Sequence, residues 1–270
     1  MNIGLIGGGA MGEAIVSAVI NAKVAAPAQI KVYDVIAERT RQLGGKYGAG
    51  IADSPDRAVE GADFVITAVK PQDFPKAASA IAGRLNSATV ISIMAGVTIA
   101  QLTAALQTDA VVRSMPNTPA QIGEGMTGWT ATPGVGETAR EGVRKILGAM
   151  GKEAYLPDEK YLDMVTGLSG SGPAYVFLFI EALTDAGVHI GLSRDLAATM
   201  ALQTVLGSAR YVEATGKHPA ELRNQVTSPG GTTAEALRVF EAGSFRSDVL
   251  EAVIAAYEKS KALGGDGKKQ

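Results

Sequence analysis

The stretch "NIGLIGGGAMGE" at residues 2–13 decides the fold that we predict for this chain. A short apolar run leads into the pattern G-x-G-x-x-G, and a segment of helical composition follows it. The first glycine permits a tight turn, the second lets the backbone approach a pyrophosphate, and the third lets helix and strand pack closely. Free N–H groups at the helix start then bind the anion. We predict dinucleotide binding, rather than a purely structural turn, by Gly7, Gly9, Ala10, Met11 and Gly12.

Asp34 ends the next apolar run, where an acidic residue completes the dinucleotide pattern. A carboxylate there accepts hydrogen bonds from both ribose hydroxyls and repels a 2′-phosphate, which favours NADH. Arg39 and Arg41 follow closely enough to bind a phosphate if Asp34 turns away. The predicted cofactor is therefore NADH or NADPH, with NADH favoured by Asp34.

The first half of the chain, to about residue 155, alternates between short apolar runs and helix-length segments. This rhythm predicts an α/β domain with a parallel, doubly wound sheet. Buried strands are expected at "NIGLIG" (2–7), "IKVYD" (30–34), "ADFVITAV" (62–69), "ATVISIM" (88–94) and "AVVRSM" (110–115). Helices are expected at 11–22, 37–47 and 98–107.

Ligands of such sheets bind at the carboxyl ends of the strands. "AVKPQ" (68–72) and "SIMAGV" (92–97) lie at two of these ends. Lys70 is either a solvated charge or a cofactor contact, and its place beside Pro71 favours contact. The predicted contacts from these segments are Ala68, Val69, Lys70, Pro71, Ala95 and Gly96.

From about residue 160 the apolar residues follow helical spacing only, which predicts an all-α domain with helices at 173–191, 193–215, 232–244 and 245–263. "GKEAYLPDEK" (151–160) is the expected hinge, which gives domains at 1–157 and 158–270. The broad apolar helix faces predict dimerisation through this half, with a compact monomeric bundle as the alternative. "GGDGKKQ" (264–270) is expected to be a frayed tail.

The composition narrows the possible partners and compartments. With 46% hydrophobic and 19% charged residues and a net charge of −2, the chain is typical of a globular protein and offers no basic surface for nucleic acid or membrane. It has no cysteine, which excludes disulfides and thiolate metal sites. The apolar N-terminus lacks a basic segment and contains Glu13, so we expect no signal peptide and a cytoplasmic location.

The sequence contains no obvious general acid or base for an alcohol dehydrogenase. His189 and His218 are the only histidines, and no metal-ligand cluster or Tyr-x-x-x-Lys pair occurs. An imine substrate removes the need for a strong acid, because its nitrogen arrives already protonated and the enzyme has only to hold and orient it.

"SPGGTT" (228–233) is suited to that task. Pro229 fixes a turn, Gly230 and Gly231 expose backbone N–H groups, and the helix that starts at Thr232 favours a carboxylate. The Thr233 hydroxyl can hydrogen-bond a ring nitrogen. A helix N-cap with a tight turn is the alternative interpretation.

The motifs, in order, resemble those of the pyrroline-5-carboxylate reductase family over nearly the whole chain: "GLIGGGAMGEAI" (4–15), "AVKPQ" (68–72), "SIMAGVT" (92–98), "RSMPNTPA" (113–120), "LSGSGPAYVF" (168–177), "EALTDAGV" (181–188) and "VTSPGGTTAEAL" (226–237). The resemblance implies NAD(P)H-dependent reduction of 1-pyrroline-5-carboxylate to L-proline, the last step of proline biosynthesis. It also implies a Rossmann domain followed by a helical domain that intertwines in a homodimer, often assembled into a decamer.

The family's site residues carry over where the motifs match. The substrate carboxylate would be held by Ser228, Gly230, Gly231, Thr232 and Thr233, with Thr233 as nitrogen partner and with Thr233 and Ser228 as the catalytic candidates. Ser169 and Ser171, in "SGSGPA", would face the nicotinamide side. Pro116 and Asn117, with Thr118, would form the loop under the nicotinamide.

The chain departs from the family at Pro55, where many relatives carry an asparagine that touches the ribose, and at Asp34, where many NADPH users have Ser, Thr or Asn. A β-hydroxyacid dehydrogenase would carry a Lys and an Asn in the helix "PAYVFLFIEAL", which has neither. A reductase of another cyclic imine and a non-catalytic NAD(H)-binding regulatory module remain open at this point.

Overall fold

The computed structural model describes residues 1–265, which form two compact units. The first unit contains Met1–Ser171 and the chain from Ala255 onward, and the second is Gly172–Ile254. Residues 266–270 of the tail predicted at 264–270 lie outside the described residues. Its first residue, Gly264, is helical. No helix within residues 1–265 has the length and apolar character needed to span a membrane.

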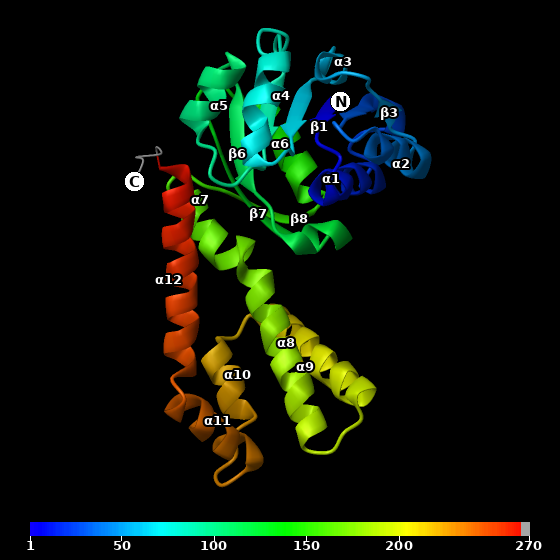
Figure 1. Cartoon of the computed structure of the whole chain (residues 1–270). Helices are drawn as coiled ribbons and strands as arrows, with labels where there is room; N and C mark the ends of the chain where they lie inside the picture. Colours follow the sequence, from blue (N-terminus) through cyan, green and yellow to red (C-terminus); the bar gives the residue numbers. More distant parts are fainter. Residues whose placement is uncertain (266–270) are drawn as a thin grey trace. The chain divides into compact units, whose positions relative to one another are not determined.

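The first unit is built on one sheet with helices on both faces (Figure 1). The strand order in the described chain is β3-β2-β1-β4-β5-β6-β7-β8. The strands are β1 (Ile3–Ile6), β2 (Ile30–Tyr33), β3 (Gly50–Ile51), β4 (Phe64–Thr67), β5 (Thr89–Ser92), β6 (Val111–Met115), β7 (Gly125–Ala131) and β8 (Gly151–Tyr155). The five predicted strands are confirmed as β1, β2, β4, β5 and β6.

The five predicted strands pair in parallel, as expected, and the far edge of the sheet adds two strands that were not predicted. β7 runs antiparallel to β6, and β8 pairs parallel with β7. The connection at 116–124 is too short for the crossover of a dozen or more residues that a parallel pair needs, so the strand direction reverses. Residues 151–155, predicted as part of a hinge, form β8, which corrects the prediction for that segment.

The helices of the first unit cover the sheet in two layers. They are α1 (Ala10–Asn21), α2 (Ala37–Tyr47), α3 (Pro55–Val59), α4 (Phe74–Ile81), α5 (Ile99–Leu106), α6 (Glu137–Gly148) and α7 (Tyr161–Val165). α1, α2 and α5 confirm the three predicted helices. Pro55 takes the first helical position of α3, where its missing N–H leaves no hydrogen bond unmade.

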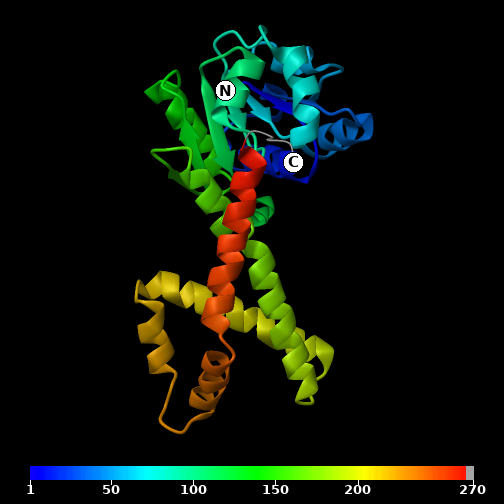
Figure 2. The same ribbon diagram turned by 60° about the vertical axis from the view of Figure 1, so that its left-hand side comes forward.

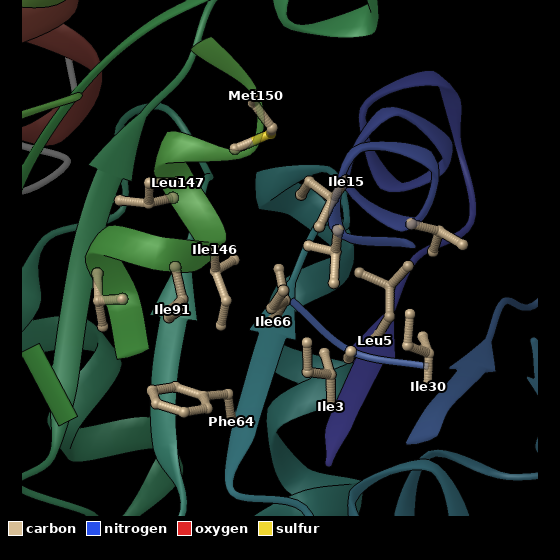
Figure 3. Close-up of a cluster of buried hydrophobic side chains, with 14 of the residues drawn as sticks. Ile3, Leu5, Ile15, Ile30, Phe64, Ile66, Ile91, Ile146, Leu147 and Met150 are labelled. Atoms are coloured by element: carbon tan, nitrogen blue, oxygen red, sulfur yellow. The ribbon is translucent and has the colours of Figure 1, made fainter. Parts of the chain in front are cut away.

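Two apolar clusters, one on each face, hold this unit together. Figure 3 shows the cluster in which Ile146 and Leu147 of α6 meet strand residues such as Leu5, Ile66 and Ile91. The opposite cluster packs α4 and α5 on the other face. α1 belongs to the first cluster, and its N-terminus follows β1 directly. The packing that buries the sheet therefore also fixes the start of α1 at the carboxyl edge of the sheet.

The second unit is formed by helices alone, with no strand among its described residues (Figure 2). Its elements are α8 (Gly172–His189), α9 (Arg194–Thr215), α10 (Pro219–Gln225), α11 (Thr232–Ala242) and the first part of α12 (Phe245–Gly264). α8 and α9 lie side by side, and a Cβ on Gly187 would be 2.8 Å from the Cβ of Ala197, so glycine permits the close approach. The four helices predicted after residue 160 are present as α8, α9, α11 and α12.

Candidate active site

The glycine loop after β1 has the backbone shape that the pattern predicts. Gly7 has φ +109°, and a Cβ on it would lie 2.5 Å from the Ala68 carbonyl oxygen. A Cβ on Gly12 would lie 2.1 Å from the carbonyl oxygen of Gly7. In contrast, no atom lies within 4 Å of the place for a Cβ on Gly9. Gly7 and Gly12 are therefore required by the protein's own packing, whereas Gly9 faces open space that a ligand can enter.

The N-terminus of α1 offers donors at that open space. Gly9 is the N-cap and has no side chain to cap the helix, and the first helical bond is donated by the Glu13 N–H to the Gly9 carbonyl. The N–H groups of Ala10, Met11 and Gly12 have no acceptor within residues 1–265. Such donors, with the positive end of the helix dipole, suit a pyrophosphate. The residues present therefore fit a dinucleotide.

Glu13, in the first turn of α1, is engaged away from this loop. Lys46 Nζ donates to Glu13 Oε1 at 2.8 Å, and the Tyr47 hydroxyl donates to the same oxygen at 3.0 Å. The hydrogen bond from Lys46 lowers the pKa of Glu13. The pairing joins α1 to the end of α2 and compensates a negative charge close to a site that binds anions.

Asp34 is held firmly against the glycine loop. Its Oδ2 accepts the Gly8 N–H at 2.7 Å and lies 3.5 Å from Arg39 Nη1, and its Oδ1 accepts the Ile36 N–H at 2.8 Å. The Asp34 side chain is only 6% exposed. Arg41 pairs instead with Glu38 at 2.9 Å. The contacts to Asp34 oppose the turning away that a 2′-phosphate would need.

The other predicted cofactor segments lie along the same edge of the sheet. Strand register places Ile6 opposite Thr67 and Thr67 opposite Ser92, so the loops that follow β1, β4 and β5 start side by side. These loops carry Ala68, Val69, Lys70, Pro71, Ala95 and Gly96. Lys70 is exposed, and its side chain forms no ion pair with any described residue.

Gly96 takes φ +73° just before α5, which only glycine adopts readily. A Cβ there would lie 3.1 Å from the Cβ of Leu263, near the end of α12. One side of this loop is therefore covered by the protein itself.

Asn117 connects two segments that are distant in the sequence. Its Oδ1 accepts the Met126 N–H at 2.9 Å, and its Nδ2 donates to the Ser169 carbonyl oxygen at 3.1 Å. Both ends of the amide are thus engaged within the protein. Ser169 lies in a turn of π-helix, Thr166–Gly170, in which the Ser171 N–H donates to the Thr166 carbonyl at 2.8 Å.

An ion pair between a buried arginine and a half-buried glutamate, which the sequence analysis did not identify, joins β6 to the segment before α7 and the start of α5. Arg113 of β6 is 5% exposed and lies in a strand whose first four residues are all buried. Its Nη1 donates to Glu159 Oε1 at 2.6 Å, and the same oxygen accepts the Ile99 N–H at the start of α5 at 2.8 Å. The signal that could have indicated the pair is a lone arginine inside the apolar run "AVVRSM".

The segment 228–233, in the second unit, forms the predicted turn. The Gly231 N–H donates to the Ser228 carbonyl at 3.1 Å, and Gly230 has φ +68°. With Pro229 at the second position, these features define a type II turn. α11 begins at Thr232, has Gly231 as an N-cap without a side chain, and leaves the Thr232 and Thr233 N–H groups without an acceptor in the part of the chain described.

The histidines have ordinary structural roles. His189 ends α8 and is exposed, and His218 caps α10 by accepting the Ala220 N–H on its Nδ1 at 3.2 Å. No group of three His, Cys, Asp or Glu side chains within residues 1–265 is arranged to hold a metal ion.

Comparison with known proteins gives matches over both halves of the chain. The family model described as pyrroline-5-carboxylate reductase dimerisation matches residues 159–263, and that described as NADP oxidoreductase, coenzyme F420-dependent, matches residues 2–96. The chain is 42% identical over 264 residues to the pyrroline-5-carboxylate reductase of Synechocystis sp., covering 98% of each chain. It is 43% identical over 263 residues to that of Escherichia coli K12, covering 97% of each.

A solved structure agrees over the same length. The pyrroline carboxylate reductase of Plasmodium falciparum, crystallised with NADP bound, superimposes with a TM-score of 0.89 at 34% identity and covers 98% of each chain. The similarity therefore extends over the loops and turns described above as well as over the sheet.

Proposed function

This chain belongs to the pyrroline-5-carboxylate reductase family, and from this premise we propose that it reduces 1-pyrroline-5-carboxylate to L-proline at the expense of NAD(P)H. Bound NAD(P)H supplies a hydride to the imine carbon, the C=N bond becomes C–N, and the ring nitrogen keeps the proton with which it arrived. The observation that carries the proposal is a pair of uncapped helix starts, those of α1 and α11, each preceded by a glycine turn.

The first unit binds the cofactor in this proposal. The free N–H groups at the start of α1 hold the pyrophosphate, and the open side of Gly9 lets it approach. Asp34 accepts from the ribose hydroxyls, and its anchoring by Gly8 and Ile36 favours NADH over NADPH. Further contacts come from the loops that carry Ala68, Val69, Lys70, Pro71, Ala95 and Gly96, and from the backbone of Pro116 and Asn117. The corresponding proposed domain is 1–157.

The proposed domain 158–270 binds the substrate. The N–H groups of Thr232 and Thr233 at the start of α11 suit a carboxylate, because the helix dipole adds to two free donors. Gly230 and Gly231 contribute backbone, and the hydroxyls of Ser228, Ser169 and Ser171 supply further hydrogen bonds. The Thr233 hydroxyl hydrogen-bonds the ring nitrogen. Orientation is the main contribution, since a protonated imine needs no strong acid.

Self-association follows from the weak core of the second unit. Only Thr184, Ala197, Ala201 and Leu222 of its described residues are buried, while Phe177 is 60% exposed and Leu178 66% exposed. Such apolar surface is characteristic of an interface between subunits. The matching family model is named for dimerisation and covers 159–263. We propose a homodimer, with the decamer implied by the family resemblance as a further assembly, in the cytoplasm.

The test is the initial rate of NADH oxidation, and separately of NADPH oxidation, with 1-pyrroline-5-carboxylate, followed by cofactor absorbance. Turnover that yields proline supports the reaction, and a higher kcat/KM with NADH supports the role of Asp34. A higher kcat/KM with NADPH would retain the reaction and overturn the cofactor assignment. No turnover with either cofactor would overturn the substrate and direct the search to other cyclic imines.

A further inference from the structure

The turn that contains Ser169 and Ser171 lies within an almost continuous helical path. α7 ends at Val165, the π-turn spans Thr166–Gly170, and Ser171 keeps helical backbone angles of φ −84° and ψ −20° before α8 begins. Single turns of π-helix are rare overall, and many of those that occur lie at functional sites. The conformation of this segment thus needs a cause.

One backbone hydrogen bond cannot form along this path. In a regular helix the carbonyl of Ser169 accepts from the N–H four residues later, which is position 173. Residue 173 is proline, which has no N–H. The Ser169 carbonyl therefore has no α-helical donor, and this half-buried oxygen is available to a donor from another segment.

Asn117 supplies that donor. Its Nδ2 donates to the Ser169 carbonyl at 3.1 Å, while its Oδ1 accepts the Met126 N–H at 2.9 Å. The two partners are a carbonyl and an N–H, so they fix which end of the amide is oxygen and which is nitrogen. The amide is held at both ends and cannot rotate without losing one of these bonds.

We propose that Asn117 is a positioning residue: its side-chain amide replaces the hydrogen bond that Pro173 cannot donate to Ser169, and so sets the turn that presents Ser169 and Ser171 to the substrate. The inference rests on the proposed function, because that function assigns these serines to the substrate. It changes the role of Asn117, whose side chain then organises the substrate side and leaves only its backbone for the cofactor.

The substitution Asn117→Asp isolates the donor. A carboxylate still accepts the Met126 N–H, but it presents an oxygen to the Ser169 carbonyl and repels it. We expect kcat/KM for 1-pyrroline-5-carboxylate to fall about 30-fold, in line with the cost of misplacing a reacting group. The Kd for the favoured nicotinamide cofactor should change less than about twofold, since the phosphate and ribose contacts are untouched.

Pro173→Ala provides a rescue, because alanine restores a backbone N–H at position 173. Four proteins are compared: the wild type, each single variant and the double variant. The effect of Asn117→Asp is thereby measured once against the wild type and once against Pro173→Ala. We expect the loss of kcat/KM caused by Asn117→Asp to be at least about fivefold smaller in the Pro173→Ala background. Denaturant unfolding of all four proteins should show the same coupling.

The outcomes separate this inference from the proposed function. An equal loss in both backgrounds would overturn it, as would a rise of about tenfold in the cofactor Kd, the mark of a side-chain cofactor ligand. If Asn117→Asp lowered the free energy of unfolding but left kcat/KM unchanged, Asn117 would have a structural role alone, and this would also overturn the inference. A wild-type protein inactive on 1-pyrroline-5-carboxylate would overturn the proposed function and the catalytic role with it. Coupling in the unfolding data would then support only the hydrogen bond.

Discussion

Arg113 Nη1 lies 2.6 Å from Glu159 Oε1, and this ion pair joins strand β6 to the segment just before α7. The same carboxylate oxygen accepts the Ile99 N–H, so the N-terminus of α5 already has an anion from the protein itself. α5 follows the loop of Ala95 and Gly96. The dinucleotide phosphates are therefore expected at α1, whose N–H groups are free, and not at α5.

Breaking the pair from one side should destabilise the protein. Glu159→Gln removes the charge that compensates the buried Arg113 while keeping an oxygen for Ile99. We expect a loss of about 2 kcal/mol in the free energy of unfolding, measured with urea. Glu124→Gln is the matched control, because Glu124 is exposed and should cost less than about 0.5 kcal/mol.

The ion pair also predicts coupling. Arg113→Met should cost at least about 1 kcal/mol less in the Glu159→Gln background than in the native one, because its partner charge is then absent. Additive losses would mean that the two residues contribute independently and that the ion pair is unimportant.

Gly9→Ala should separate cofactor binding from folding. Gly9 has φ −72°, which alanine adopts freely, and its added Cβ meets no atom within 4 Å. We expect the melting temperature to change by less than about 2 °C, while the cofactor Kd rises by about tenfold or more as the methyl group occupies the approach of the pyrophosphate. Binding can be measured by titration of cofactor fluorescence.

Gly12→Ala is the companion variant, in which the added Cβ would clash with the protein itself. Its Cβ would be 2.1 Å from the Gly7 carbonyl oxygen, so the loop itself must move. Its melting temperature should fall by several degrees, a loss of about 1–3 kcal/mol. Equal melting temperatures for the two variants would contradict the distinction between packing glycine and ligand-facing glycine.

Asp34→Ser should change the choice of cofactor. The substitution removes the negative charge that repels a 2′-phosphate and releases Arg39 from its partner. We expect the ratio of kcat/KM for NADPH to that for NADH to rise about 10- to 100-fold. Arg41→Ala should leave the ratio within about twofold, since Arg41 pairs with Glu38. An unchanged ratio for Asp34→Ser would rule out this carboxylate as the determinant.

Thr233→Ala tests the turn before α11. Loss of the hydroxyl should lower kcat with 1-pyrroline-5-carboxylate by about tenfold or more, while the cofactor Kd stays within about twofold. Thr227→Ala is a suitable control, because the Thr227 hydroxyl donates to the Arg223 carbonyl at 2.7 Å and has no proposed part in the site. If cofactor affinity fell instead of kcat, the role given to this turn would be wrong.

Leu178→Arg should dissociate the proposed dimer. The Leu178 side chain is 66% exposed in the single chain, and a charge in an apolar interface is unfavourable. Sedimentation velocity at micromolar concentration should show a species with the mass of a single chain, 27.7 kDa. Gln121→Arg, an exposed position of the first unit, should keep the wild-type mass. If the Leu178→Arg protein kept the wild-type mass, α8 would not be part of the interface.

The elements that the sequence predicted best are those whose signals are local. β1, the glycine loop and α1 follow one another directly, and α2 begins at residue 37 and ends at residue 47 as expected. β7 was missed because "GMTGWTA" mixes glycine and polar residues, and its strand form depends on pairing with β6. β8 was missed because its strand form depends on pairing with β7 at the edge of the sheet in the described residues.

In the candidate site, too, only the features that depend on neighbouring residues could be predicted from the sequence. The glycine loop and the turn at 228–231 could be predicted because both are set by neighbouring residues. The bond between Asn117 and Ser169 spans 52 positions, and that between Arg113 and Glu159 spans 46. Each joins two segments that only the fold brings together, and no local sequence pattern around one partner indicates the other.

The end of α12 has a consequence for the order in which the protein is made. Ser260 Oγ donates to Asp163 Oδ1 at 2.6 Å, and Leu263 packs against Gly96, so the first unit takes its last piece from beyond the second. A ribosome completes all of Gly172–Ile254 before it supplies that piece. The first unit therefore gains its contacts with the end of α12 only after the whole of the second unit has been synthesised.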